Sequence, residues 1–524
     1  MSLLRKKGAG ASRPLRSARR VGQAVLPVLA AVALSGLPAF AAAGPSPVSG
    51  PSPFAGCTSV TPPPVASPPG TATLYPNTEV EPFVASNPAN SDNLIGVWQQ
   101  DVYSTRSARG AVAAYSTNGG KTWGTTPLPF TGCAPSPLLE PSTGKPYDAV
   151  YDNWVSVGPD GTAYTTAAAG NSTTSSNGIV AAASTDGGKT WSDATTIVDS
   201  VQDPSGQHKF FNDKPSVTAD PARAGAAYAV WDQLSASRIF PIYTSNSRGP
   251  ALFSRTTDGG RTWSTPAAIY DPGEQNQTID NQVVVVHGVL YDFFDLLSAT
   301  GNTAPGGGTT PVGHVAFITS ADGGQTWSAP TIVAGLDTVG VSDPNTGAAV
   351  TTGGITSLAP AFDPVTGELY AVWQDGRFSG GRYDEIAVSS SADLGKTWSA
   401  AARLSTDTGR PAFNPAIAVR ADGTVGVSYY DLRALSPTNT TTLPTGYWLK
   451  ELRPGAAGFG PDVPLWPAGQ PFNLMAAPVV AGGYFLGDYQ GLSSSLTSLF
   501  VATTCSDSSC VGKSNPTDVY TGSP

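Results

Sequence analysis

Residues 184–191 decide the fold, and they read Ser184-Thr-Asp-Gly-Gly-Lys-Thr-Trp191. Four further stretches share the pattern Ser/Thr-x-Asp-x-Gly-x-x-Trp, with Asn118 replacing the Asp in the first copy and Leu394 replacing a Gly in the last. The five copies are Ser116–Trp123, Ser184–Trp191, Thr256–Trp263, Ser320–Trp327 and Ser391–Trp398. Their tryptophans are 64 to 72 residues apart, and such regular spacing indicates one structural unit repeated along the chain.

Each copy is expected to form the turn of a β-hairpin. Apolar residues such as Ile179–Ala183 precede the turn and a second short run such as Thr195–Val198 follows it. The Asp can accept hydrogen bonds from its own turn, Asn118 can do the same, and Leu394 is tolerable if its φ is ordinary. The Trp is expected to pack between neighbouring units. The residues expected to be structural in this way are Asn118, Trp123, Asp186, Trp191, Asp258, Trp263, Asp322, Trp327, Asp393 and Trp398.

The repeated unit is longer than its turn and predicts a blade of four antiparallel strands, hence an all-β propeller. Counting the starts of the units favours seven blades, with six as the alternative. The starts lie near Glu81, Asp152, Asp213, Asp280, Leu358, Asn414 and Asp488. The last unit has three strand-like runs, so we expect Thr71–Tyr75 to supply its fourth strand and close the ring.

The phrase resembles the Asp box, or bacterial neuraminidase repeat, of the sialidase-like β-propellers, from about Leu74 to the C-terminus. That resemblance implies the propeller fold and says little about the reaction. Sialidases use an arginine triad, a Tyr–Glu nucleophile pair and an Asp acid. Their Phe/Tyr-Arg-Ile-Pro motif is missing, since Glu81-Pro-Phe-Val stands near its place, and Tyr429, Tyr489 and Glu385 match the Tyr–Glu pair only loosely. The chain is therefore not a close match to a true sialidase.

The N-terminus indicates export. A basic segment without acids, an apolar run over 21–37 and the small-x-small site Ala39-Phe-Ala41 predict a signal peptide over residues 1–41. Residues 42–72 read as a linker rich in Pro, Ser and Gly, and residues 73–524 as the propeller. Pro27, Gly36 and Pro38 argue against a retained membrane helix, so no membrane span is expected after cleavage. The protein is expected to be secreted.

Charge and cysteines agree with this location. Seven of the 29 basic residues leave with the signal, so the mature chain has a formal net charge near −16. A surface of that sign disfavours nucleic acid and anionic membranes, and we expect a monomer. The four cysteines suggest two disulfides, Cys57–Cys133 and Cys505–Cys510 being the favoured pairing among three. No zinc site is expected, because no His lies near the Cys505-x4-Cys510 pair.

Charged residues gather where the second strand of a unit meets its long loop. Loops joining the second and third strands share the face opposite the repeated turns, and function usually lies on such loops. Two Asp-x-Arg pairs occur there, so the candidate catalytic residues are Asp101, Asp375, Arg377, Asp431 and Arg433. The candidate substrate-binding residues are Arg106, Asp213, Asp232, Arg382, Tyr429 and Asp488. We expect the Asp-x-Arg pairs to face a central channel.

Three interpretations of these charges compete. The favoured one is recognition of a glycan at the channel face without proven catalysis, with Trp98, Trp231, Trp373 and Tyr430 either stacking on sugars or packing the blades. The second is a glycoside hydrolase of exo-sialidase type cleaving an acidic sugar, in which two carboxylates act as acid and base. The third is a structural role in a scaffold that binds protein. No cofactor is expected, although carboxylates can hold Ca²⁺, and no Asp-x-Asp-x-Asp-Gly loop supports such a site.

Overall fold

A computed structural model of the chain describes residues 47–66, 69–172, 176–192, 194–201, 209–236, 248–303, 309–352, 357–467, 470–511 and 517–524. The chain divides into residues 1–43 and the unit Gly44–Pro524, and the predicted signal peptide lies outside the described residues. Among the residues described, no helix has the length and apolar character to cross a membrane.

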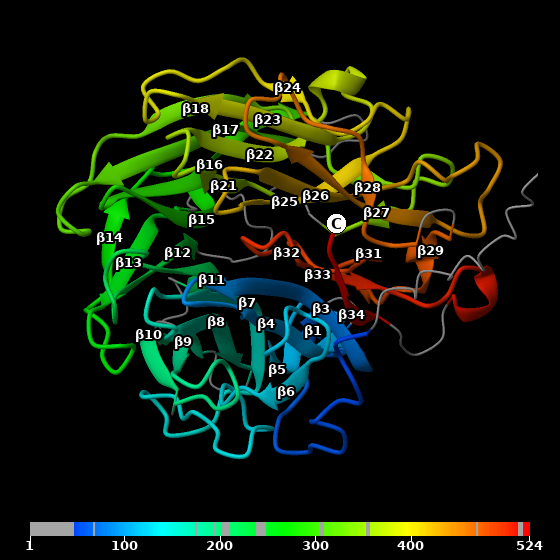
Figure 1. Ribbon diagram of the computed structural model, residues 1–524. Coiled ribbons are helices and arrows are strands. Elements are labelled where there is room, and N and C mark those ends of the chain that lie inside the picture. Colours follow the sequence, from blue (N-terminus) through cyan, green and yellow to red (C-terminus); the bar gives the residue numbers. More distant parts are fainter. Residues whose placement is uncertain are drawn as a thin grey trace, which may run out of the picture. The chain divides into compact units, whose positions relative to one another are not determined.

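Antiparallel sheets make up the unit Gly44–Pro524, and Figure 1 shows them arranged around a common centre. The first group is β3 (Leu74–Asn87), β4 (Asn90–Tyr103), β5 (Ala108–Ser116) and β6 (Gly124–Pro127). The second is β7 (Ala149–Val157), β8 (Ala163–Asn171), β9 (Ser176–Ser184) and β10 (Thr195–Val201). The third is β11 (Lys209–Ala219), β12 (Ala227–Ala236), β13 (Ala251–Thr256) and β14 (Ala267–Tyr270). The fourth is β15 (Asn276–Val286), β16 (Val289–Thr303), β17 (Thr309–Ser320) and β18 (Thr331–Leu336).

The remaining groups follow the same order. The fifth is β21 (Ala359–Phe362), β22 (Leu369–Asp375), β23 (Glu385–Ser391) and β24 (Ala402–Arg403). The sixth is β25 (Ala412–Val419), β26 (Val425–Asp431), β27 (Pro444–Leu452) and β28 (Val463–Pro464), with β29 (Phe472–Asn473) also pairing with β27. The last is β32 (Gly491–Leu492), β33 (Ser498–Ala502) and β34 (Asp518–Gly522). Three short 3-10 helices, η1 (Arg377–Ser379), η2 (Leu474–Ala476) and η3 (Ser508–Cys510), lie in connections.

The first strands of these groups line the centre. In the order β3, β7, β11, β15, β21, β25 and β32, each contacts the next, and β32 contacts β3. The fold is therefore an all-β propeller. The first two groups are joined into one hydrogen-bonded sheet by the pairing of Ala108 with Val150. The number of sheets therefore does not give the number of blades. Seven blades stays a prediction, which the closed series of inner strands supports.

The ring is closed by a different segment from the one expected. Pro47 bridges Tyr520 of β34, and the Val48 amide donates to the Val519 carbonyl at 2.7 Å. Thr71–Tyr75 was expected at this edge, but Leu74 and Tyr75 pair with Tyr103 and Val102 of β4 instead. Because Phe54 is also buried, the part of the predicted linker that begins at residue 47 belongs to the folded unit.

A small sheet joins two long connections at the end of the channel where the inner strands begin. It consists of β19 (Val341–Ser342), β20 (Ala349–Val350), β30 (Val479–Val480) and β31 (Gly483–Tyr484), in the order β19-β20-β31-β30. Val480 and Phe485 pack there against Val80, Val102 and Ala108 of the first group. This contact fixes the connection into β32 on top of β3 and β4.

The repeated turns have the expected hydrogen bonds. In the second copy, the Thr190 amide and hydroxyl donate to the Asp186 carboxylate at 3.0 and 2.6 Å. The Gly188 amide donates to the Ser184 hydroxyl at 3.0 Å, and copies three to five repeat these contacts. The side chain of Asn118 substitutes in the first copy, because its Oδ1 accepts from the Thr122 amide at 2.9 Å.

The tryptophans of the repeated turns are half-buried between consecutive sheets, as predicted. Trp191 packs on Ile95 and Val97 of β4 as well as on its own sheet. Trp398 meets Phe293 and Phe317 of the preceding sheet, with ring centroids 6.0 and 6.1 Å apart. Burial of such rings is worth roughly 25 cal/mol per Å² of apolar surface, so five of them stabilise the joints between sheets.

Leu394 departs from the expectation for the fifth repeat. Its φ is 61°, in the same left-handed region as the glycines it replaces, for example Gly259 at 79°. The expected ordinary φ is therefore wrong. The turn geometry is kept against the preference of a branched side chain because the hydrogen bonds of Ser391 and Asp393 hold it.

The predicted Cys57–Cys133 disulfide is confirmed, and it ties the N-terminal segment to the loop after β6. Cys505 is also disulfide-bonded. The side chain of Cys510 lies outside the described ones, so the Cys505–Cys510 pairing stays a prediction.

Candidate functional site

Five inner strands carry a β-bulge near their beginning, and each bulge holds a residue with positive φ. These residues are Glu81, Asp152, Lys214, Asp280 and Asn414, with φ between 49° and 59°. A bulge re-aims side chains, and a left-handed L-residue costs about 1–2 kcal/mol. Because the bulges occur at equivalent places in neighbouring sheets, they gather polar side chains at one end of the channel.

Six charged side chains meet at this end, and we call Glu81, Arg106, Asp152, Asp213, Lys214 and Asp488 the channel cluster. The Lys214 ammonium lies 2.6 Å from Asp488 Oδ2 and 3.8 Å from Asp152 Oδ1. Arg106 contacts the same Asp488 oxygen at 3.1 Å. The Asp488 amide donates to Glu81 Oε1 at 3.0 Å, so the first, second, third and last groups of strands share one network.

Two acids of the cluster hold protons more tightly than free carboxyls. Burial raises the pKa of Asp213 well above its usual value, and its hydrogen-bonded neighbour Asp152 raises it further. Burial and the charge of Asp152 raise the pKa of Glu81 likewise. Two like carboxyls in contact cannot both ionise readily, so Asp213 keeps its proton to a higher pH than a free carboxyl does.

The ion pair at the centre of the cluster is fully charged. Burial would raise the pKa of Asp488, but Lys214 and Arg106 outweigh it and lower that pKa. Burial would lower the pKa of Lys214, but Asp488 and Asp152 raise it. The pair therefore gives the cluster a fixed, polar framework around the protonated Asp213.

Of the channel cluster, Arg106 is the member with a largely exposed side chain. The Arg106 side chain is 42% exposed, whereas the Lys214 side chain is 9% exposed. The rings of Tyr151 and Phe211 lie beside Asp213 and Arg106, stacked at 5.8 Å with an interplanar angle of 6°. Exposed charged groups next to a flat aromatic pair are suited to bind a polar ring-shaped ligand.

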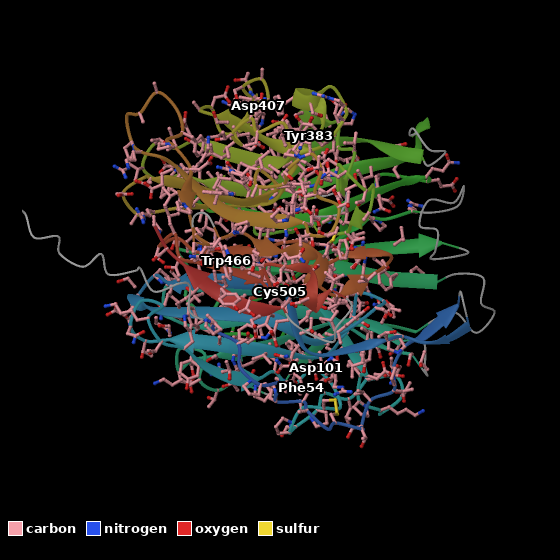
Figure 2. All side chains as sticks on the ribbon, turned by 90° about the vertical axis from the view of Figure 1, so that its right-hand side faces the viewer. Phe54, Asp101, Tyr383, Asp407, Trp466 and Cys505 are labelled. Atoms are coloured by element: carbon pink, nitrogen blue, oxygen red, sulfur yellow. A yellow bond between two sulfur atoms is a disulfide. The ribbon has the colours of Figure 1, made fainter. Side chains whose placement is uncertain are left out.

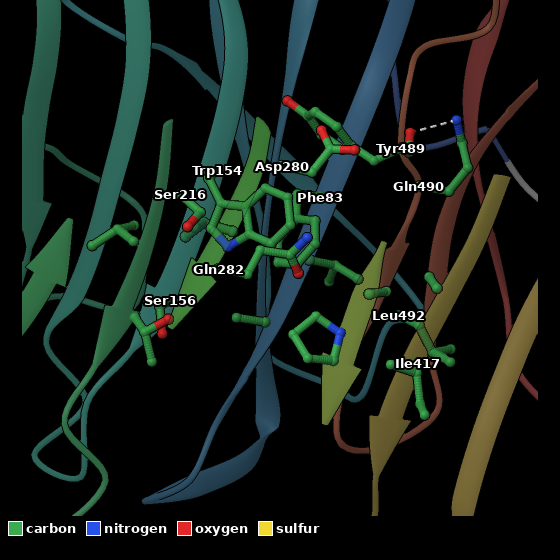
Figure 3. Close-up of a pocket in the computed structure, with 18 of the residues that line it drawn as sticks. Phe83, Trp154, Ser156, Ser216, Asp280, Gln282, Ile417, Tyr489, Gln490 and Leu492 are labelled. Carbon is green, nitrogen blue, oxygen red and sulfur yellow. Dashed lines mark hydrogen bonds between the residues drawn. The ribbon is translucent and has the colours of Figure 1, made fainter. Parts of the chain in front are cut away.

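A cavity of about 290 Å³ lies on the other side of the Lys214–Asp488 pair, between the inner strands. Reading along β11, Asp213 comes first, Lys214 and Ser216 line the cavity, and Ala219 reaches the repeated-turn face. Figure 3 shows Phe83, Trp154 and Tyr489 on one wall of this cavity. The Phe83 and Trp154 rings stack at 3.6 Å, and Tyr489 meets Trp154 edge-on at 5.2 Å.

Four of the predicted substrate-binding residues come together here. Arg106, Asp213 and Asp488 belong to the channel cluster, and Asp232 pairs with Asp213 in the β11–β12 register. Burial and the charge of Asp213 raise the pKa of Asp232 well above its usual value. Three further members, Glu81, Asp152 and Lys214, were not predicted as site residues. All three have a positive φ at equivalent bulges of the inner strands, and the sequence indicated only that Glu81 and Asp152 lie near the starts of repeated units.

Asp101 is not part of the cluster. Its carboxylate accepts from the Asn77 amide at 2.7 Å and faces Arg109 at 3.4 Å. Figure 2 shows Asp101 beside Phe54 near the disulfide, at the edge opposite Tyr383. Arg109 also donates to the Phe54 carbonyl, so these contacts anchor the N-terminal segment.

The two Asp-x-Arg pairs do not face the channel together, and that expectation is corrected. Arg377 pairs with Asp375 at 2.7 Å and reaches Asp337, which follows the outer strand β18. Arg433 pairs with Asp431 and lies 3.0 Å from Asp462, beside the outer strand β28. Neither arginine lines the channel cavity. The acids on the outer strands draw the guanidinium groups away from the centre.

The remaining candidates also have local partners. Arg382 donates to the Ser379 carbonyl at 2.8 Å, and Tyr429 is buried and donates to Asp462. Burial and Asp462 raise the pKa of Tyr429. The aromatic residues Trp98, Trp231, Trp373 and Tyr430 are at most 1% exposed, so they pack the blades and present no face to a sugar.

Within the described residues, no group of three or more His, Cys, Asp or Glu side chains is placed to hold a metal ion. The acids of the channel cluster are instead neutralised by Lys214, Arg106 and bound protons.

Comparisons with known proteins find only distant structural similarities. No family model matches the chain, and no curated protein matches it. An α-L-arabinofuranosidase from Fusarium graminearum is 14% identical with a TM-score of 0.44, over 68% of this chain and 91% of that one. The NanB sialidase from Streptococcus pneumoniae is 12% identical with a TM-score of 0.40, over 68% and 65% of the two chains.

A protein of unknown function from Dyadobacter fermentans covers more of the chain, 86%, at 14% identity and a TM-score of 0.43. Similarities this distant carry no argument about activity or substrate.

Proposed function

We propose that the protein recognises a glycan at the channel cluster, from the end of the channel where the inner strands begin. The observation that carries the proposal is the convergence of Arg106 from the first group of strands with Asp213 and Lys214 from the third, where the Arg106 side chain is 42% exposed. Sugar hydroxyls are both donors and acceptors. A guanidinium, a protonated carboxyl and a carboxylate pair with them in several ways at once.

The balance of charge favours a neutral glycan over an acidic one. Both cations of the channel cluster, Lys214 and Arg106, already contact Asp488, so neither is free to pair with an incoming carboxylate. The hydroxyl groups of a neutral sugar need no such counter-charge. This argument disfavours the exo-sialidase alternative among the expected functions.

The test is binding of matched oligosaccharides to the mature chain, first on a glycan array and then by isothermal titration calorimetry. Arg106→Ala is expected to lower the affinity for a hit at least tenfold, because it removes a charged hydrogen-bond donor. Arg223→Ala is the matched control, since Arg223 also pairs with an acid, Asp220, but at the repeated-turn face. An array without hits contradicts the proposal. The proposal is also contradicted if Arg377→Ala abolishes binding while Arg106→Ala does not. That result would place the binding site in the fifth group of strands.

Hydrolysis of a glycosidic bond is the second candidate, and the raised pKa of Asp213 favours it. Glycoside hydrolases pair a protonated carboxyl that acts as the acid with a carboxylate about 5–9.5 Å away that acts as base or nucleophile, so Asp152, which contacts Asp213, is too close to be that partner. Asp213, with its raised pKa, suits the acid role.

Turnover of a panel of neutral fluorogenic glycosides tests this second candidate. Asp213→Asn is expected to lower kcat by about 10²–10⁴-fold while binding persists, because it removes the proton but keeps the shape. The wild-type rate is expected to fall as the pH rises through the raised pKa of Asp213, since the acid must be protonated. Turnover that Asp213→Asn leaves unchanged would exclude this assignment.

We also propose that the protein acts outside the cell. The predicted signal peptide and the Cys57–Cys133 disulfide both support export to an oxidising compartment. We propose a secreted monomer. The N-terminal residue of the mature protein, read by mass spectrometry after expression with the full leader, tests cleavage after Ala41.

A further inference from the structure

The channel cavity is separate from the exposed side of the channel cluster. The Lys214–Asp488 ion pair closes one end of the cavity, and Asp213 and Arg106 lie beyond that pair and outside the cavity lining. Towards the repeated-turn face the wall includes partly exposed residues such as Ser156 and Thr218. A ligand can therefore occupy this cavity without touching Arg106.

Three buried polar atoms in the cavity lining have no hydrogen-bond partner among the described residues. They are Asn281 Oδ1, Ser357 Oγ and Asp488 Oδ1, on residues that are 0%, 8% and 8% exposed. Leaving such a group unpaired costs about 1–3 kcal/mol. They come from the fourth group, the start of the fifth and the start of the last, so acceptors surround the space from several sides.

The opposite wall supplies an aromatic surface. Trp154 stacks on Phe83 at 3.6 Å, and the edges of both rings meet Tyr489, so the three side chains hold one another in place (Figure 3). An aromatic face opposite hydrogen-bond acceptors matches the two sides of a sugar ring, which has apolar C–H faces and hydroxyl donors at its edge.

Within the part of the chain that the structure describes, the lining of the cavity has no free cation for an acidic ligand. The Lys214 ammonium is held by Asp488 Oδ2 and Asp152, Asp280 is a further acid of the lining, and Val155, Val217 and Ile417 line the walls. Pockets for small ligands begin at about 300 Å³, so a cavity of about 290 Å³ suits a ligand of one ring.

We propose that the channel cavity binds a single neutral sugar ring, held on Trp154 and hydrogen-bonded to Asn281, Ser357 and Asp488. This site is distinct from the one at the exposed side of the channel cluster. It requires no catalysis, and Arg106 takes no part in it.

Titration of the mature chain with D-glucose, D-galactose and N-acetyl-D-glucosamine tests the proposal, with calorimetry and saturation-transfer NMR as readouts. Ser357→Ala is expected to weaken binding about 5- to 10-fold, the loss expected for one neutral hydrogen bond. It leaves thermal stability unchanged, because the deleted hydroxyl has no partner. Thr166→Val is the matched control, since its buried hydroxyl is also unpaired but does not line the cavity.

A second variant blocks the space. Ala359→Phe places a ring in the cavity from β21 and is expected to abolish saturable binding, with the melting temperature reporting whether the fold survives. Ser357→Ala is expected to leave the affinity of an oligosaccharide found on the array unchanged, because Ser357 is not part of the channel cluster, and this separates the two sites. No saturable binding of any of the three sugars overturns the proposal, and so does binding that both Ser357→Ala and Ala359→Phe leave unchanged.

Discussion

At the scale of single residues, strain and function meet where the inner strands begin. Glu81, Asp152 and Lys214 adopt left-handed backbone conformations although each carries a long or charged side chain. Such positions persist only when their surroundings hold them, and here the side chains hold one another through Asp488. The strain therefore supports the proposal that this end of the channel is the functional one.

Leu394 offers a test of strain without function. Leu394→Gly is expected to raise the free energy of unfolding by about 0.5–1 kcal/mol, because relief of the left-handed conformation outweighs the entropy of the added glycine. Little burial is lost, since Leu394 is 43% exposed. Urea unfolding measures the change. Gly259→Ala in the third repeat is the control, with room for its Cβ at φ 79°, and it is expected to lose about 1 kcal/mol. Equal stabilities for all three proteins would contradict the interpretation.

Asp292 is a buried acid whose two oxygens have no partner among the described residues, and burial raises its pKa well above the usual value. The folded carboxyl binds its proton more tightly than the unfolded one. The free energy of unfolding therefore falls as pH rises above about 4, by about 1.4 kcal/mol per unit until the folded group ionises. Asp292→Asn is expected to remove this slope and raise stability at pH 7. Thermal melts between pH 4 and 8 measure it, and parallel curves for the two proteins would refute the argument.

Ionisation of Asp258 has the opposite effect on stability, because the pKa of this carboxyl is lowered in the folded protein. Hydrogen bonds from the Thr262 hydroxyl and amide, despite slight desolvation, lower the pKa of Asp258 to about 2. Its stabilising effect is present above the unfolded value near 4 and is lost as pH falls towards 2. Asp258→Asn is therefore expected to melt earlier than the wild type at pH 7 and at the same temperature near pH 2. An equal loss at both pH values would assign the effect to something other than ionisation.

At the scale of elements, the repeated Ser/Thr-x-Asp-x-Gly-x-x-Trp motif predicted the turns because their hydrogen bonds join residues within eight positions. The packing of the tryptophans was expected from the regular repetition of the motif, since their partners are distant in the sequence, as Phe293 is from Trp398. The starts of the inner strands were predicted because each unit opens with a similar local pattern. The direction of the Arg377 and Arg433 side chains was not predicted, because it depends on their ion pairs with Asp337 and Asp462, which lie next to outer strands. No local sequence pattern identifies those partners. The channel cluster likewise joins Arg106 to Asp488, which lie 382 positions apart.

The N-terminal segment acts as one more strand at the seam of the ring. Deleting residues 42–50 from the mature chain is expected to lower the melting temperature and promote aggregation, because it exposes the edge of β34. Deleting only residues 42–46 is the control, since the bridge to Tyr520 begins at Pro47. Differential scanning calorimetry and light scattering report both effects. Identical behaviour of the two deletions would show that Pro47–Ser49 does not close the sheet.

The disulfide fixes the same segment to the first group of strands. Its cysteines are separated by 76 residues, so the paired substitution Cys57→Ser and Cys133→Ser is expected to cost about 2–5 kcal/mol in the free energy of unfolding. Denaturant unfolding measures the loss. A loss below about 0.5 kcal/mol would mean that the contacts of Phe54 and Val48 hold the segment without the covalent bond.

At the scale of the whole molecule, the ring of inner strands creates two environments on either side of one ion pair. Asp213 and the exposed Arg106 lie on one side of Lys214–Asp488, and the cavity with its unpaired acceptors lies on the other. The five repeated turns stand at the far face, where their tryptophans stabilise the joints between sheets. The proposed site therefore lies at the face opposite the turns that stabilise the fold.

The most direct test of the central claim is a crystal structure of the mature protein soaked with the oligosaccharide that binds best on the array. The account predicts a sugar ring within hydrogen-bond distance of Asp213 and Arg106, at the end of the channel where the inner strands begin. A glycan bound only beside Arg377 or Arg433 near the outer strands, with the channel cluster untouched, would contradict it.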